Sequence, residues 1–139
     1  MTHRGRCYCG HVSIEARAVQ TVAYCHCEDC KRWTGAPLPA FAAVSRDGLT
    51  CTPDLGEGRS FAPGVQRWNC PDCGSPLAAT FDYLPGQTYI PLGLFDGLDA
   101  LGPAVHCHAD KQAAWLHISD DLPRRAGSAR AFLTDAEHD

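Results

Sequence analysis

The sequence lacks any apolar run long enough to span a bilayer, and residues 1–6 do not lead into the apolar segment that a secretory leader needs. We therefore expect a cytoplasmic protein without a membrane partner, in a compartment where thiols stay reduced. The sequence also lacks a basic surplus, because 12 Lys and Arg stand against 16 Asp and Glu and the formal net charge is -4. Nucleic acids and anionic membranes both attract basic surfaces, so this charge argues against either as a partner.

No internal repeat and no long amphipathic helix can be found in the 139 residues. Frequent Gly and Pro instead separate short segments that have the alternation or apolar character of β-strands. This predicts one mainly β domain of short antiparallel strands at residues 1–125, followed by a polar, loosely attached tail at 126–139. The segments expected as strands are 11–16, 22–24, 40–44, 49–52, 65–69, 77–83, 88–94, 104–108 and 113–118. A single helical turn is expected at 28–33 and at 96–102, and an exposed loop at 53–64.

Cysteine, by contrast, is abundant: the chain has nine, an odd number that suits a disulfide framework poorly. Seven of the nine lie in groups with the spacing of metal ligands, namely Cys7-x-Cys9, Cys25-x-Cys27-x-x-Cys30 and Cys70-x-x-Cys73. In a reducing compartment such groups indicate metal or redox chemistry. Gly10 and Gly74 directly follow the two pairs, where a glycine eases the turn that brings both thiols to one metal.

The spacing suggests which thiols share a metal. The two pairs together supply the four thiolates of a closed, structural zinc site: Cys7, Cys9, Cys70 and Cys73. The three remaining clustered cysteines, Cys25, Cys27 and Cys30 (the triple), then supply three ligands to a second zinc. They leave one coordination position open, which a small thiol substrate could occupy as a thiolate. On this interpretation the catalytic centre is formed by Cys25, Cys27 and Cys30. Spacing alone leaves open a closed second site, whose fourth ligand would be His26, Cys51, Cys107 or His108.

Longer motifs carry a family resemblance. They are Gly5-x-Cys7-x-Cys9-Gly10-x-Val12, Cys25-His26-Cys27-x-x-Cys30-x-Arg32-x-x-Gly35-Ala36-Pro37 and Arg67-x-x-Cys70-x-x-Cys73-Gly74-x-x-Leu77, with Asp96, Pro103, His106, Trp115 and residues 120–123 later in the chain. In this order they resemble the glutathione-dependent formaldehyde-activating enzyme (GFA) family, also called the centromere protein V family, over about residues 3–125.

The resemblance implies a β-rich fold of the Mss4-like, or β-tent, type. It also implies a structural zinc on the two cysteine pairs and a second zinc on the triple. The activity implied is that of a carbon–sulfur lyase acting on a thiol adduct such as S-hydroxymethylglutathione, with glutathione or a similar small thiol as the partner. One fold hosts several functions, however, so the substrate does not follow from the family alone.

Several further residues are candidates for substrate binding near the ligand loops: Lys31, Arg32, Trp33, Arg67 and His106. The three cations could hold the carboxylates of glutathione, although each could equally be a solvated surface charge. In an alternating strand His106 and His108 share one face and Cys107 the other, so these three side chains should not meet at one metal. We expect His106 to line the pocket or to complete a hydrogen-bond network, and Cys51 and Cys107 to be buried as small apolar groups.

Two rival functions remain on sequence grounds. One is a non-catalytic zinc-binding module that presents its β surface to a protein partner. The other is a thiol redox enzyme of the methionine sulfoxide reductase type, which would need a reactive cysteine outside the metal sites, either Cys51 or Cys107.

Overall fold

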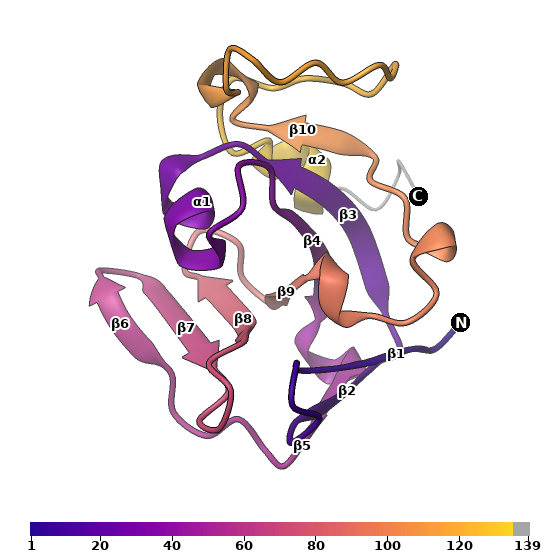
Figure 1. Cartoon of the computed structure of the whole chain (residues 1–139), viewed down its shortest axis with the longest axis vertical. Coiled ribbons are helices and arrows are strands. Elements are labelled where there is room, and N and C mark those ends of the chain that lie inside the picture. Colours follow the sequence, from indigo (N-terminus) through magenta and orange to yellow (C-terminus); the bar gives the residue numbers. More distant parts are fainter. Residues whose placement is uncertain (135–139) are drawn as a thin grey trace.

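The computed structural model describes residues 1–134, and these residues fold around two β-sheets (Figure 1). Within them the strands are β1 His3–Arg6, β2 Ser13–Ala16, β3 Val19–Cys25, β4 Ala40–Ser45, β5 Leu49–Thr52, β6 Arg59–Ala62, β7 Val65–Asn69, β8 Pro76–Phe81, β9 Gln87–Pro91 and β10 Val105–Cys107. The α-helices are α1 Glu28–Thr34 and α2 Arg130–Thr134, and the 3-10 turns are η1 Arg46–Gly48, η2 Leu92–Leu94, η3 Leu98–Ala100 and η4 Ala109–Lys111. No helix in this part of the chain has the length and apolar character needed to span a membrane. The predicted mainly β architecture is confirmed.

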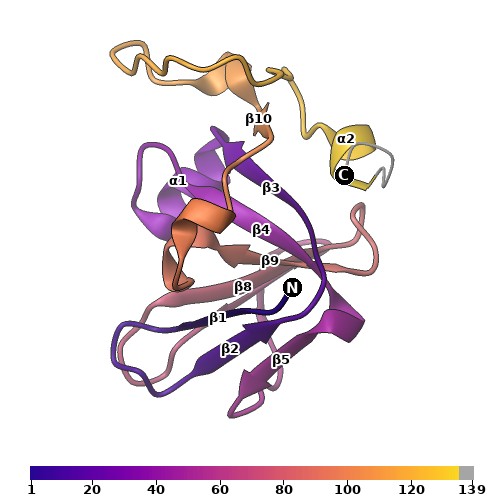
Figure 2. The same ribbon diagram turned by 90° about the vertical axis from the view of Figure 1, so that its right-hand side faces the viewer.

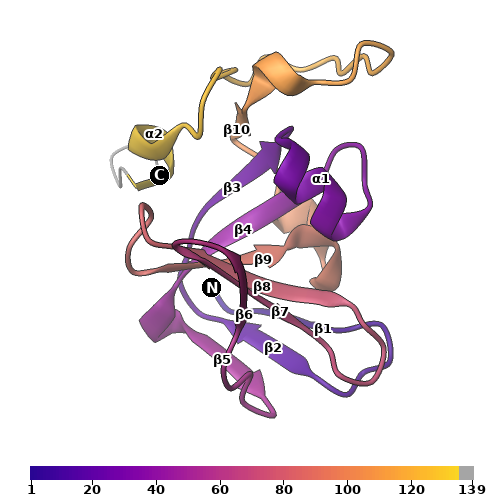
Figure 3. The same cartoon turned by 90° about the vertical axis from the view of Figure 1, so that its left-hand side faces the viewer.

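The larger sheet has seven strands in the order β10-β3-β4-β9-β8-β7-β6. All its neighbours pair antiparallel except β10 and β3, which run parallel. The smaller sheet has the order β1-β2-β5 and is antiparallel throughout. Figures 2 and 3 show the smaller sheet at the opposite end of the molecule from β10 and α2.

The central strands of the larger sheet are buried on both faces, and alternate residues therefore belong to two different cores. On one face Val22, Ala42 and Ile90 pair side by side and pack with apolar residues of the smaller sheet, such as Ile14. The second core lies on the other face, and its members include Ala23, Phe41, Ala43, Tyr89, Val105, Cys107 and Leu133. Because side chains alternate along a strand, one sheet can support a structural core on one side and a site on the other.

Three sequence predictions about secondary structure were wrong. Residues 113–118 form no strand: the Leu116 amide bonds the Ala113 carbonyl in a turn, and Trp115 is 68% exposed, so its apolar character does not reflect burial. Residues 59–62, placed in a loop by the sequence, form the edge strand β6, whose residues are all exposed and so carry no alternating pattern. Residues 92–94 continue β9 as the 3-10 turn η2.

The structure also contains a strand that the sequence analysis did not anticipate, β1, which includes Gly5. A side chain at Gly5 would collide with the Leu94 backbone, because Gly5 bridges to Phe95 at this point. Glycine is therefore required here for close approach of two backbones rather than for a turn.

The polar C-terminal segment, expected as a loose tail, contains α2. Leu133 is buried in the second core, its carbonyl accepts a 3.0 Å hydrogen bond from Gln87 Nε2, and Arg130 Nε donates to the Tyr83 carbonyl at 2.7 Å. Ala129 and Phe132 also pack against this core, but only Leu133 is fully buried, so the short segment shows no periodic apolar pattern in the sequence. Residues 135–139 lie outside the described residues.

Candidate metal centres and the adjoining cavity

The two cysteine pairs lie together, and their four ligand atoms are all within 4.8 Å of one another. The Sγ–Sγ distances are 3.7 Å for Cys7–Cys9, 3.7 Å for Cys7–Cys70 and 3.8 Å for Cys9–Cys70. A tetrahedral metal with bonds of about 2.3 Å to sulfur would space its ligands by about 3.8 Å. The donor set and its spacing thus fit a closed four-thiolate metal site.

The local backbone holds these thiols in place. The Cys7 amide bonds the Val12 carbonyl, and the Val12 amide in turn donates to Cys7 Sγ at 3.3 Å. The Cys70 amide bonds the Ser75 carbonyl, which closes the second turn. A metal bound here would tie the β1–β2 turn to the β7–β8 turn, across 63 residues of sequence.

The triple of cysteines forms the second cluster at the junction of β3 and α1. Cys25 ends β3, Cys27 is the N-cap of α1 and accepts the Cys30 amide at 3.4 Å, and Cys30 lies in the first turn. The helix ends at Gly35, whose φ of 75° lets its amide bond the Lys31 carbonyl at 2.7 Å. The three Sγ atoms lie within 4.8 Å of one another, with 3.3 Å between Cys25 and Cys27.

Crowding makes three thiolates here costly without a cation. Hydrogen bonds from the Cys25 and Cys30 thiols lower the pKa of Cys27 to about 2. The same hydrogen bond to Cys27 helps raise the pKa of Cys25 to about 12, and the hydrogen bonds with Cys25 and Cys27 raise the pKa of Cys30 as well. The cluster on its own therefore stabilises a single negative charge, and only a bound metal ion would let all three sulfurs ionise.

Among residues 1–134, no fourth His, Cys, Asp or Glu joins this cluster within the same 4.8 Å. The alternatives named from the sequence lie elsewhere. His26 is fully buried and turned to His106, Cys51 is part of β5, and Cys107 and His108 line the adjoining cavity without entering the group. The second cluster thus offers a metal three protein ligands.

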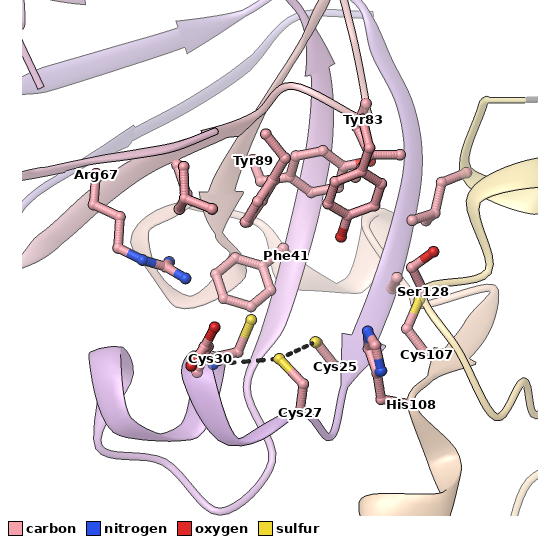
Figure 4. A pocket seen from close by; sticks show the side chains of 17 residues that line it. Cys25, Cys27, Cys30, Phe41, Arg67, Tyr83, Tyr89, Cys107, His108 and Ser128 are labelled. Carbon is pink, nitrogen blue, oxygen red and sulfur yellow. Dashed lines mark hydrogen bonds between the residues drawn. The ribbon is translucent and has the colours of Figure 1, made fainter. Parts of the chain in front are cut away.

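A cavity of about 240 Å³ adjoins the triple (Figure 4). Its wall is formed by Ala23, Cys25, Cys27, Asp29, Cys30, Phe41, Val65, Arg67, Ala79, Phe81, Tyr83, Leu84, Tyr89, Cys107, His108, Ser128 and Leu133. Most of these side chains are apolar or aromatic. The sheet contributes the residues of its second face, and α2 closes one side through Leu133.

Arg67 reaches the cavity because of strand register. Its partner across the β7–β8 pair is Ala79, and the partner of Ala79 across β8–β9 is Tyr89, so all three lie in one row on the same face. The guanidinium lies 4.6 Å from the centre of the Trp33 ring and 5.6 Å from that of Phe81. Its Nη1 atom is buried and has no hydrogen-bond partner among the described residues.

The other candidate residues are less close to the cavity. The Lys31 ammonium donates to the Lys111 carbonyl at 2.6 Å, and this side chain does not line the cavity. Arg32 and Trp33 line a separate hollow beside it, which shares Asp29, Val65 and Arg67 with the cavity. Trp33 stacks at 6.2 Å on Phe41 and donates to Asn69 Oδ1 at 3.3 Å.

His106 completes a hydrogen-bond network and does not line the cavity. Its Nε2 lies 2.9 Å from Asp120 Oδ2, and its Nδ1 lies 2.8 Å from His26 Nε2. A carboxylate only accepts, so His106 donates from Nε2 to Asp120. The buried His26 Nδ1 has no hydrogen-bond partner among the described residues. Burial lowers the pKa of His26 to about 4, so this ring stays neutral. This hydrogen-bond network from Asp120 through His106 thus fixes His26, the residue between Cys25 and Cys27, from the opposite face of the sheet.

The predicted alternation along residues 106–108 is only half right. His106 and Cys107 do point to opposite faces, with Cys107 in the cavity wall. However, β10 ends at Cys107, and His108 has a left-handed φ of 52°. The backbone turn at His108 therefore brings its side chain into the cavity wall beside Cys107, contrary to the expectation that it would share a face with His106.

Sequence reasoning missed most of the cavity wall, including Asp29, Phe41, Phe81, Tyr83, Tyr89 and Ser128. A usable signal existed for Phe41 and Tyr89, since both stand at alternate positions in strands that are apolar on both faces. Ser128 and Leu133 gave none, because they lie in a segment without pattern.

Comparison with known proteins was consistent with these features. The profile of the glutathione-dependent formaldehyde-activating enzyme family matches residues 2–111. An uncharacterized lyase of Schizosaccharomyces pombe is 26% identical over 100 residues, which make up 70% of this chain and 71% of that protein. A crystal structure of a Rhodobacter sphaeroides protein aligns with a TM-score of 0.55 at 22% identity, over 68% of this chain and 88% of that chain. The last match is a likeness of fold alone.

Proposed function

Because the chain belongs to the glutathione-dependent formaldehyde-activating enzyme family, we propose that it is a zinc-dependent carbon–sulfur lyase-type enzyme acting on a small thiol adduct of an aldehyde. One observation carries the proposal. The four-cysteine cluster offers a metal a complete set of ligands, whereas the three-cysteine cluster offers three and lies in the wall of a cavity. Three protein ligands beside a cavity are typical of a metal that meets substrate, and four are typical of a structural one.

Zinc is the metal that the donors favour. Clusters made only of thiolates suit soft or borderline ions, and a tetrahedral arrangement of sulfurs is typical of zinc or iron. When bound by the triple, zinc would supply a Lewis acid that stabilises a substrate thiolate near neutral pH. The test for zinc itself is elemental analysis of the purified protein, for which we expect two zinc ions per chain.

The reaction needs one proton transfer besides bond formation. In the direction of synthesis the thiol sulfur attacks the aldehyde carbon, a C–S bond forms, and the π electrons of C=O move to oxygen. The proton lost by the thiol ends on that oxygen, and the lyase direction reverses each step. His108 and Asp29 line the cavity together with the triple, and we assign them to hold the proton in transit. The apolar wall excludes water from the adduct.

A redox function draws less support from the structure. Cys107 does line the cavity, but it is 4% exposed and burial raises its pKa to about 12. Burial also raises the pKa of Cys51, to about 11. Both thiols lack the electropositive, accessible surroundings of a reactive cysteine.

Cobalt substitution tests the proposal. We expect charge-transfer bands from two thiolate-bound ions, one of which shifts when glutathione or 2-mercaptoethanol is added. Cys27→Ser is the control and should abolish the response to thiol while the bands of the four-cysteine site persist. Two cobalt sites that ignore every small thiol would overturn the enzyme proposal and favour a non-catalytic zinc-binding module.

A further inference from the structure

The side chains that line the cavity beside Cys25, Cys27 and Cys30 suit the binding of an aromatic ring. Three of its side chains are Phe41, Phe81 and Tyr89, and the Phe81 and Tyr89 rings meet edge to face with centroids 5.6 Å apart. Ala79, opposite Tyr89, and Ala23, opposite Phe41, also line the cavity, and their short side chains leave space beside these rings. An apolar cavity of about 150 Å³ can hold benzene, so the 240 Å³ present here suits one substituted ring.

Glutathione matches this wall poorly. It carries two carboxylates and an ammonium, each of which needs a charged or hydrogen-bonding partner when it leaves water. Within residues 1–134 the cavity offers Arg67 as its guanidinium and Asp29 as its carboxylate, while Lys31 is bonded elsewhere and Arg32 lines the separate hollow. Besides the cysteines, the other polar side chains that the described residues add to the wall are Tyr83, Tyr89, His108 and Ser128, so only one of the two glutathione carboxylates can pair with a guanidinium in this cavity.

The Arg67 guanidinium is preorganised to bind one anion. Trp33 and Phe81 hold its guanidinium within 4.6 and 5.6 Å of their ring centres, so little side-chain freedom is lost on binding. The buried Nη1 has no partner among the described residues, and Arg67 makes no ion pair among them. A donor left unsatisfied in this way is costly, and a ligand carboxylate would satisfy it with a charge-assisted bond.

From these features we infer that the cavity selects a thiol or aldehyde built on a single aromatic ring that carries a carboxylate. The ring packs against Phe41, Phe81 and Tyr89, the carboxylate binds Arg67, and the reacting group faces Cys25, Cys27 and Cys30. The inference rests on the proposed function and deepens it by naming the substrate class. Glutathione itself is then a weaker ligand than such an aromatic anion.

The experiment compares three thiols on the cobalt-substituted protein. They are 4-(mercaptomethyl)benzoate, its neutral carboxamide, and glutathione, all of which are alkyl thiols, so differences in thiol acidity stay small. We expect the benzoate to titrate the cobalt band at concentrations at least tenfold lower than either of the others. Calorimetry with benzoate and benzamide, which contain no thiol, measures the same preference on the zinc-loaded protein.

Variants separate the role of Arg67 from general damage. Arg67→Gln should weaken the two benzoates about ten- to a hundredfold, a loss typical of a buried charge-assisted bond, and leave the two amides unchanged. Arg59→Gln is the matched control, because Arg59 pairs with Arg67 across β6–β7 and also stacks on an aromatic ring, Phe61, but does not line the cavity. Ala79→Val should weaken every aromatic probe by filling the space, with the cobalt spectrum intact.

The outcomes distinguish the two levels of the proposal. Equal affinity for benzoate and amide, or tighter binding of glutathione, would overturn the aromatic-anion inference even if every thiol shifts the cobalt band. An equal loss for benzoate and amide in Arg67→Gln would show that Arg67 only supports the fold. If no thiol shifts the band, the lyase proposal fails, but a calorimetric preference for benzoate that depends on Arg67 would still support the assignment of the cavity.

Discussion

Replacing Cys7 by serine should destabilise the protein severely, because it removes a ligand of the site that links distant turns. Cys7 is 1% exposed, and the loop between it and Cys70 spans 63 residues. Treated as a covalent cross-link, closure of a loop this long contributes about 4 kcal/mol through the unfolded chain. Domains of this kind are stable by only about 5–15 kcal/mol, so the loss is a large part of the total.

The assay is thermal unfolding of the zinc-loaded protein, followed by circular dichroism. At about 4 °C per kcal/mol for a chain of this size, Tm should fall by about 15 °C in Cys7→Ser. Two controls bracket the result. Cys51→Ser removes a half-buried thiol outside both clusters, and Cys27→Ser removes a ligand from a cluster that spans only residues 25–30, so both should shift Tm by a few degrees. A Cys7→Ser protein as stable as Cys51→Ser would refute the cross-link argument.

Two further predictions concern titratable groups. The hydrogen bond from His106 is the main cause that keeps the pKa of Asp120 below its ordinary value. The ionised carboxylate therefore stabilises the folded protein fully above about pH 4, the pKa of the unfolded chain. This stability is lost as the pH falls through the lower pKa of the folded state. Urea unfolding at several pH values should therefore show Asp120→Asn less stable than wild type at pH 6, with the gap closing below pH 4; a gap that is constant to pH 3 would contradict the network. Cys107, buried and with its pKa raised to about 12, should react with iodoacetamide at pH 7.5 far more slowly than free cysteine does, as mass spectrometry of the zinc-loaded protein would record. Fast, selective labelling of Cys107 would instead support the redox function.

The cysteine clusters could be predicted from the sequence because their geometry is mostly local. Cys25, Cys27 and Cys30 lie within one strand end and one helical turn, where spacing almost determines distance. The pairing of residues 7–9 with 70–73 is not local, yet the count of thiols left few alternatives. The strands were predictable where burial alternates with exposure, and this signal failed for β6, which is exposed on both faces.

The cavity could not be predicted in this way, because it depends on register between strands that are distant in sequence. Arg67 enters the site only because it stands opposite Ala79, which stands opposite Tyr89. A shift of one residue in either pairing would turn Arg67 to the other face of the sheet, toward the core that surrounds the four-cysteine cluster. The same alternation puts Cys107 on the face of the sheet that lines the cavity and its neighbour His106 on the opposite face.

The two faces of the sheet therefore act on the same short loop. On the cavity face, Cys25 and Cys27 line the cavity. On the opposite face, His26, which lies between them in the sequence, is anchored through His106 to Asp120. Because His26 is fully buried and neutral, it cannot leave this position without breaking a 2.8 Å hydrogen bond and exposing a packed ring. A metal ion with only three protein ligands gains from such an anchor, since ligands that are already fixed lose less freedom on binding. The histidine in the Cys-His-Cys motif would thus support a metal bound by the triple through rigidity, because the structure anchors it to His106 and Asp120 and leaves it outside the group of possible ligands.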